Sequence, residues 1–219
     1  MKPTDTSTSS LIDRLVAERP ERRPFRLTLA RGLGVAAFAG AAAIAIARAT
    51  KFRAPLADLV SGPHEAIELG LLLIFLVLAV VFAIGTAIPG WTERRPRLTR
   101  VTLAAFGLAA ATILVRASEG ATHSPFFGSW GISCALLLAA VGLGSALLLS
   151  FIVRRGTVTR PALTAWGTTF FGCAMGMLVL ELHCGDESAS HLLVGHFGGL
   201  LTFALFFAPF AYRRLAKRK

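Results

Sequence analysis

The amino-acid sequence predicts an all-α protein, a bundle of six transmembrane helices. Hydrophobic residues make up 54% of the 219 residues and charged residues only 16%, a balance that a soluble domain of this length cannot bury. The chain contains six apolar stretches, each near the roughly 20 residues that a helix needs to cross a bilayer. None of them alternates apolar and polar residues as a strand of a membrane barrel does, so helices are expected.

The expected spans divide the chain into three parts. The spans are 27–47, 66–88, 98–115, 130–153, 161–182 and 191–212. A head of residues 1–26 precedes this membrane domain of residues 27–212, and a basic tail of residues 213–219 follows it. The head mixes acids such as Asp13 and Glu18 with its arginines, which is unusual for a removable signal peptide. We therefore expect the first span to be retained.

The distribution of basic residues predicts the orientation of the bundle. A net charge of +11 could indicate nucleic-acid binding, but the basic residues gather in the head, in the tail and in two of the five connections between spans. These two connections contain Arg94, Arg95 and Arg97, with Arg100 just inside the next span, and Arg154, Arg155 and Arg160. The other connections hold only Arg48, Lys51, Arg53 and Arg116. Basic residues mark the cytoplasmic side of a membrane protein. Both termini are therefore expected inside, and the polar stretch ELHCGDESASH at 181–191 is expected outside.

The head is expected to carry a short amphipathic helix over residues 10–19. Its apolar residues fall along one face: Leu11, Ile12, Leu15 and Val16. Pro20 ends the helix, and Arg22 and Arg23 follow it. Such a helix is marginal in water by itself and needs a surface to lie on. That surface is either the lipid headgroups, which would make the helix an interfacial anchor, or a groove on a protein partner.

The middle of the spans shows few groups that transport would need. Pumps and carriers place ionisable residues near the midplane. The deepest ionisable residue here is His196, and a lone histidine on a helix is more often a packing or interhelical hydrogen-bonding residue. Cys173 lies halfway through span five and is expected to pack. Glycines in three spans predict that spans four, five and six approach one another closely. They are Gly142 and Gly144 in span four, Gly172 and Gly176 in span five, and Gly195, Gly198 and Gly199 in span six. A transporter of a soft metal ion or small solute therefore stays the alternative function.

Two cysteines are expected near the same outer interface. Cys134 lies about one turn inside span four, and Cys184 directly follows span five. They can form a disulfide or redox switch, bind a soft metal ion, or remain unpaired, and their spacing does not decide between these. The candidate accessory ligands of a metal site are His123, His183, Asp186 and His191.

Four stretches in order resemble the NrsF-type family of negative regulators of sigma F. They are LIDRLVAE, AIPGW, RRGTVTRPAL and LHCGDES. Members of this family are six-span anti-sigma factors of the bacterial inner membrane. The resemblance implies that the head sequesters an extracytoplasmic-function sigma factor, and that Cys134 and Cys184 receive the signal, metal or oxidative stress, that releases it.

The resemblance also defines the expected partners and chemistry. The protein is expected to be a binding protein and not an enzyme, with the sigma factor and the lipid bilayer as partners and no direct contact with nucleic acid. The apolar face of helix 10–19 would dock on the sigma factor, with Arg22 and Arg23 adding charge pairs. No cofactor is required, beyond a transient soft-metal ion at Cys134 and Cys184.

Overall fold

A computed structural model describes residues 63–94, 96–119, 129–154, 158–185 and 188–217, together with residues 30, 34, 37 and 41. This part of the chain is all-helical. Its helices are α4 (Pro63–Thr86), α5 (Trp91–Arg94), α6 (Pro96–Glu119), α7 (Ser129–Arg154), α8 (Pro161–His183), α9 (Ala189–His191), the π-helix η1 (Leu192–Gly198) and α10 (Gly199–Ala216). The last three follow one another without a break and form one rod from Ala189 to Ala216.

Five of the six expected spans are confirmed as helices long and apolar enough to cross a membrane. The first expected span, 27–47, falls almost wholly outside the described residues, although residues 30, 34, 37 and 41 are each helical. The expected head helix at 10–19, with Leu11, Ile12, Leu15, Val16, Arg22 and Arg23, also lies outside them. The orientation of the bundle in the membrane stays a prediction.

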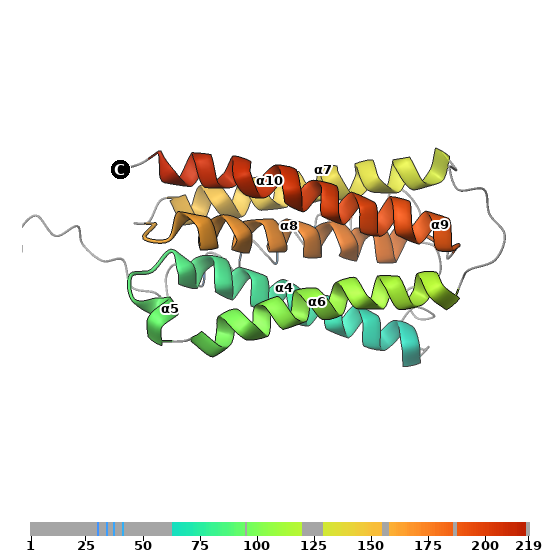
Figure 1. The fold of residues 1–219 in the computed structure, drawn as a ribbon, viewed down its shortest axis with the longest axis horizontal. Coiled ribbons are helices and arrows are strands. Elements are labelled where there is room, and N and C mark those ends of the chain that lie inside the picture. The colour runs from blue at the N-terminus through green and yellow to red at the C-terminus, as the bar shows by residue number, and fades with distance from the viewer. Residues whose placement is uncertain are drawn as a thin grey trace, which may run out of the picture.

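Helix α8 occupies the centre of the bundle. It contacts α4, α7 and α10, and the long helices run side by side along the length of the molecule (Figure 1). Every residue of α8 from 167 to 182 is buried. The surrounding helices turn large apolar side chains outward instead: Leu136 is 65% exposed and Phe206 is 77% exposed. Such a surface is costly in water and suits contact with lipid.

Close packing of α7 against α8 depends on glycine, as the sequence predicts. A Cβ added at Gly172 would lie 2.7 Å from the carbonyl oxygen of Gly142. This distance is too short for a van der Waals contact, so a side chain at Gly172 would force the two backbones apart. Small residues at such crossings let membrane helices gain van der Waals contact. Cys173 follows directly, is fully buried in this core and contributes to its packing.

The two ends of the bundle differ in construction. At one end the AIPGW stretch forms a turn between α4 and α5, in which Gly90 has a φ of 73° that favours glycine. At the other end α6 and α8 terminate, and α4, α7 and α9 begin (Figure 1). We call this second end the thiol end, because Cys134 and Cys184 lie there.

Candidate metal and thiol site

Four side chains from three segments meet at the thiol end. Cys134 lies on the second turn of α7, and Cys184 caps the C-terminus of α8. His191 ends α9, and His196 lies in η1. The metal-binding atoms of these four residues all lie within 4.8 Å of one another. We refer to Cys134, Cys184, His191 and His196 as the thiol–histidine cluster.

The two sulfur atoms are in contact but not bonded. Cys134 Sγ lies 3.7 Å from Cys184 Sγ, whereas a disulfide bond measures about 2.05 Å, and neither residue forms a disulfide. Cys184 Sγ also lies 3.0 Å from His191 Nε2, and the tautomer of the ring decides which atom donates the hydrogen bond. A cysteine beside an imidazole can transfer its proton to the ring and become the reactive thiolate.

The backbone of Cys184 aims its side chain into the cluster. Helix α8 ends at His183, and Cys184 adopts an extended conformation with φ −88° and ψ 119°. Its N–H still donates a hydrogen bond of 2.7 Å to the carbonyl of Leu180, which ties the turn to the last turn of the helix. Cys184 is thus held at the helix end while its side chain leaves the helical path.

The π-helix η1 brings the two histidines together. In an α-helix each residue advances by about 100°, so residues five apart point about 140° away from each other. The i→i+5 pattern of a π-helix widens the turn, and residues five apart then share a face. The rings of His191 and His196 accordingly meet edge to face, with their centroids 5.3 Å apart.

Gly195 lets η1 approach α7 closely enough to complete the cluster. A Cβ at this position would lie 2.9 Å from the carbonyl oxygen of Gly131 and 3.4 Å from Cβ of Cys134. Any side chain there would push η1 away from the first turns of α7. The neighbouring His196 would move with it, so the absence of a side chain at Gly195 helps to set the distance between the histidine and the thiols.

The donor set and its spacing fit a tetrahedral ion. Two metal–sulfur bonds of about 2.3 Å at tetrahedral angles place the sulfur atoms about 3.8 Å apart, close to the 3.7 Å between Cys134 and Cys184. The same geometry requires about 3.6 Å between a sulfur and a nitrogen ligand, so the 3.0 Å contact of Cys184 with His191 would have to open slightly. Thiolate and imidazole donors favour zinc-like, soft divalent ions.

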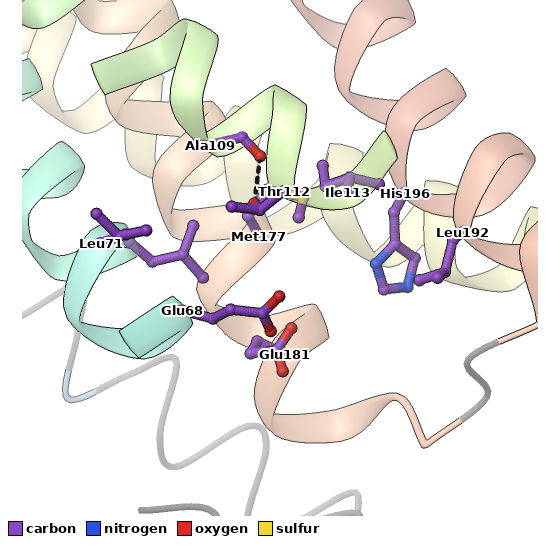
Figure 2. Close-up of a pocket in the computed structure, with 10 residues that line it drawn as sticks. Glu68, Leu71, Ala109, Thr112, Ile113, Met177, Glu181, Leu192 and His196 are labelled. Atoms are coloured by element: carbon purple, nitrogen blue, oxygen red, sulfur yellow. Dashed lines mark hydrogen bonds between the residues drawn. The ribbon is translucent and has the colours of Figure 1, made fainter. Parts of the chain in front are cut away.

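A small cavity lies beside the cluster and shares His196 with it, and a few polar side chains interrupt its mostly apolar lining. The cavity measures about 20 Å³, and its lining includes Glu68 of α4, Glu181 of α8 and Thr112 of α6. Figure 2 shows the carboxyl groups of Glu68 and Glu181 next to each other, with the His196 ring across the same space. Both glutamates are buried, at 7% and 8% exposure. Glu181 is therefore part of a buried helix face and not of a polar loop.

The sequence identified part of this site and missed part. It singled out Cys134, Cys184 and His191, and the structure brings them together. His183, another expected accessory ligand, is half-buried at the end of α8 and is not in the cluster. Asp186 and His123 lie outside the described residues. His196 was expected to be a packing or hydrogen-bonding residue, and it is instead a cluster member.

These features define a class of protein: a bundle of membrane-length helices with a buried thiol–histidine cluster near one end. The family model for negative regulators of sigma F (NrsF) matches residues 15–216. The chain belongs to this family, so the sequence resemblance is confirmed over most of its length, and the family description makes a sigma factor the expected partner. No curated protein and no solved structure gives a significant match to the chain.

Proposed function

We propose that the protein is an anti-sigma factor of the bacterial inner membrane that holds an extracytoplasmic-function sigma factor at the cytoplasmic face. Membership of the family of negative regulators of sigma F supports this role. The head supplies the docking element: the apolar face of helix 10–19 contacts the sigma factor, and Arg22 and Arg23 pair with its acidic residues. The membrane bundle carries the signal that ends this contact.

The proposed signal receiver is the Cys134–Cys184 pair, which faces the outside of the membrane in the predicted orientation. One observation carries this proposal: the two sulfur atoms lie 3.7 Å apart, beside two buried histidines. The spacing supports both chemistries that the sequence left open. It argues against the third alternative, in which the two thiols never meet.

Oxidation of the pair requires only a small movement. The sulfur atoms must approach by roughly 1.6 Å to form a bond of about 2.05 Å. His191 Nε2, 3.0 Å from Cys184 Sγ, is positioned to take the proton of this thiol. The resulting thiolate attacks a peroxide, which releases hydroxide and leaves a sulfenic acid on Cys184. The thiol of Cys134 then displaces water from this sulfur to form the disulfide. In total the two thiols give up two protons and two electrons.

Capture of a soft metal ion uses the same four side chains. Cys134 and Cys184 lose their protons and bind as thiolates, and His191 and His196 bind as neutral imidazoles. The two negative charges balance those of a divalent ion, so the filled site carries no net charge. This balance matters because an uncompensated charge at a buried position is costly. Such an ion would be a signal held transiently, not a resident cofactor.

Either event would tighten the thiol end and change how the helices pack. The cluster joins α7, the end of α8 and the rod that begins at Ala189. Drawing these three segments together shifts α7 and α10 relative to α8. The opposite ends of α7 and α10 carry Arg154, Arg213 and Arg214, on the predicted cytoplasmic side. A bundle with two packing arrangements can thus couple the thiols to the docking of the head.

The sensor is tested with a reporter of sigma-dependent transcription in cells challenged with cadmium or with a thiol oxidant. We expect the wild-type protein to allow induction, and the double variant Cys134→Ser/Cys184→Ser to keep the reporter silent. Cys173→Ser is the matched control, because its thiol is also buried on α8 but lies outside the cluster. Equal induction with the wild-type protein and the double variant would show that Cys134 and Cys184 are not the sensor.

The docking role of the head is tested separately. Deletion of residues 11–23 should release the sigma factor and switch the reporter on without any stress. The truncated protein must still reach the membrane, which fractionation of the cells and detection of a C-terminal tag would establish. A reporter that stays fully silent would show that another part of the chain holds the sigma factor.

A soft-metal transporter is the second candidate, and the acidic cavity beside the cluster favours it. Buried ionisable residues within spans often mark an ion pathway, and Glu68 and Glu181 are such residues. Transport predicts that vesicles containing the protein accumulate cadmium across the membrane. A binding-only sensor predicts uptake no greater than one ion per protein, with no dependence on vesicle volume.

A further inference from the structure

We propose that Glu68 and Glu181 are positioning residues for His196. Through one water molecule in the shared cavity they accept the hydrogen bond of the ring N–H that faces them, and this holds the other ring nitrogen toward the thiols as a metal ligand. The inference rests on the proposed metal capture at the thiol–histidine cluster. It adds two carboxylates on α4 and α8 to a site otherwise built from α7, the end of α8 and the final rod.

The first observation is the unsatisfied nitrogen of His196. The residue is only 4% exposed, and its Nε2 atom has no hydrogen-bond partner among the residues that the structure describes. A buried polar nitrogen left without a partner costs about 1–3 kcal/mol. His196 also lines the cavity that contains the two carboxyl groups. Figure 2 draws Nδ1, the nitrogen next to the point of attachment of the ring, on the side of these carboxyl groups, and Nε2 on the far side. The carboxyl groups can therefore accept the hydrogen bond of Nδ1–H, which leaves the unpartnered Nε2 as the ligand nitrogen.

The second observation is the size and chemistry of the cavity. Its volume of about 20 Å³ suits one water molecule, since such a site needs roughly 10–15 Å³ and at least two polar partners. Glu68, Glu181 and His196 supply those partners from three different helices. Thr112 also lines the space, but its hydroxyl donates a hydrogen bond of 2.9 Å to the carbonyl of Ala109 in its own helix (Figure 2).

The third observation is that His196 belongs to both features. Its imidazole contributes a nitrogen to the thiol–histidine cluster and also borders the acidic cavity. Metal-binding histidines characteristically donate their second N–H to a carboxylate or a water molecule, which fixes the tautomer and raises the basicity of the ligand nitrogen. The arrangement of His196 between thiols and carboxylates has this form.

The test measures the affinity of the full-length protein for Cd²⁺ in lipid nanodiscs, by the ultraviolet absorbance of the cadmium–thiolate bond. We expect the double variant Glu68→Gln/Glu181→Gln to bind Cd²⁺ about 10- to 100-fold more weakly. Glutamine preserves the size of each side chain but is a weaker hydrogen-bond acceptor than a carboxylate. The variant Glu68→Gln/Glu181→Asp, which keeps one carboxylate, should bind Cd²⁺ more tightly than the double glutamine variant. Thr112→Val should bind like the wild type.

A second readout needs no metal. In protein labelled with ¹⁵N-histidine, the ring of His196, assigned with the variant His196→Gln, should populate one tautomer in the wild type and a mixture in the double glutamine variant. Unchanged cadmium affinity together with an unchanged tautomer would overturn the inference and leave the proposed function standing. Failure of the reduced wild-type protein to bind Cd²⁺ would overturn metal capture and this inference together. The transcriptional effect of an oxidant would remain as a separate test of the thiol sensor.

Discussion

Cys173 and the pair Cys134–Cys184 show how one residue type serves two purposes in the same bundle. Cys173 is fully buried at the middle of α8, among apolar side chains of the core. Cys134 lies on α7 and Cys184 at the C-terminal cap of α8. At this thiol end each thiol contacts the other, and Cys184 also contacts an imidazole. A cysteine in apolar surroundings behaves as a small hydrophobic residue. Reactivity requires a neighbour that can take or replace the proton.

Cys173 and the pair Cys134–Cys184 should differ most in their effect on the affinity for Cd²⁺. Single replacement of Cys134 or Cys184 by serine should weaken Cd²⁺ binding at least 100-fold, since a four-ligand zinc site is worth about 10–16 kcal/mol and one ligand roughly a quarter of that. Cys173→Ser should change the affinity less than about threefold, because its sulfur lies outside the cluster. Titration of the cadmium–thiolate absorbance in nanodiscs gives these values. Comparable losses in all three variants would show that the effect is one of folding and not of ligation.

The apolar spans were predictable because a bilayer imposes a narrow range of helix lengths. The close packing of α7 on α8 was predictable from Gly142 and Gly172 for a similar reason, since only small residues allow such an approach. Topology predicted only that Cys134 and Cys184 lie near the same interface, because one span starts and the next ends there. Their contact, with the sulfur atoms 3.7 Å apart, is seen only in the structure.

The histidine ligands were only half predictable. A search for ligand pairs on a helix looks for residues four apart, as in HxxxH, because an α-helix places those on one face. His191 and His196 are five apart and share a face only because η1 is a π-helix. The available signal was Gly195, directly before His196 in HLLVGH, because a glycine in a span indicates close approach to another helix. His183 misled for a related reason: it adjoins Cys184 in sequence, but the chain leaves the helix between them.

The next largest effect should be on the rate at which the thiols of the cluster are oxidised. His191→Gln should slow formation of the Cys134–Cys184 disulfide by a mild oxidant at least tenfold, because a positioned base typically contributes 10² or more. The control is His183→Gln, which changes the histidine adjacent to Cys184 but outside the cluster. Mass spectrometry of peptides from samples quenched with acid follows the disulfide. An unchanged rate in His191→Gln would mean that the 3.0 Å contact has no part in activating the thiol.

Gly195 provides a smaller, geometric perturbation of the thiol end. Gly195→Ala places a Cβ 2.9 Å from the carbonyl oxygen of Gly131, so η1 must move away from α7. We expect roughly tenfold weaker Cd²⁺ binding, from a strain of about 1–3 kcal/mol of which part is relieved by displacing His196. Gly144→Ala is the matched control on α7, since a Cβ there meets no atom within 4 Å. Equal affinity in the two variants would show that the cluster tolerates the displacement of η1.

The smallest expected effect on the thiol end comes from disturbing the middle of the bundle. Gly172→Ala brings a Cβ within 2.7 Å of the carbonyl oxygen of Gly142, and overpacking of this kind costs about 1–3 kcal/mol of stability. The thermal unfolding midpoint in detergent should therefore fall relative to Gly144→Ala. Cadmium affinity should stay within about threefold of the wild type if the bundle middle packs independently of the cluster. A large loss of affinity in Gly172→Ala would instead show that core packing and metal binding are coupled, which is the linkage that a transmembrane signal requires.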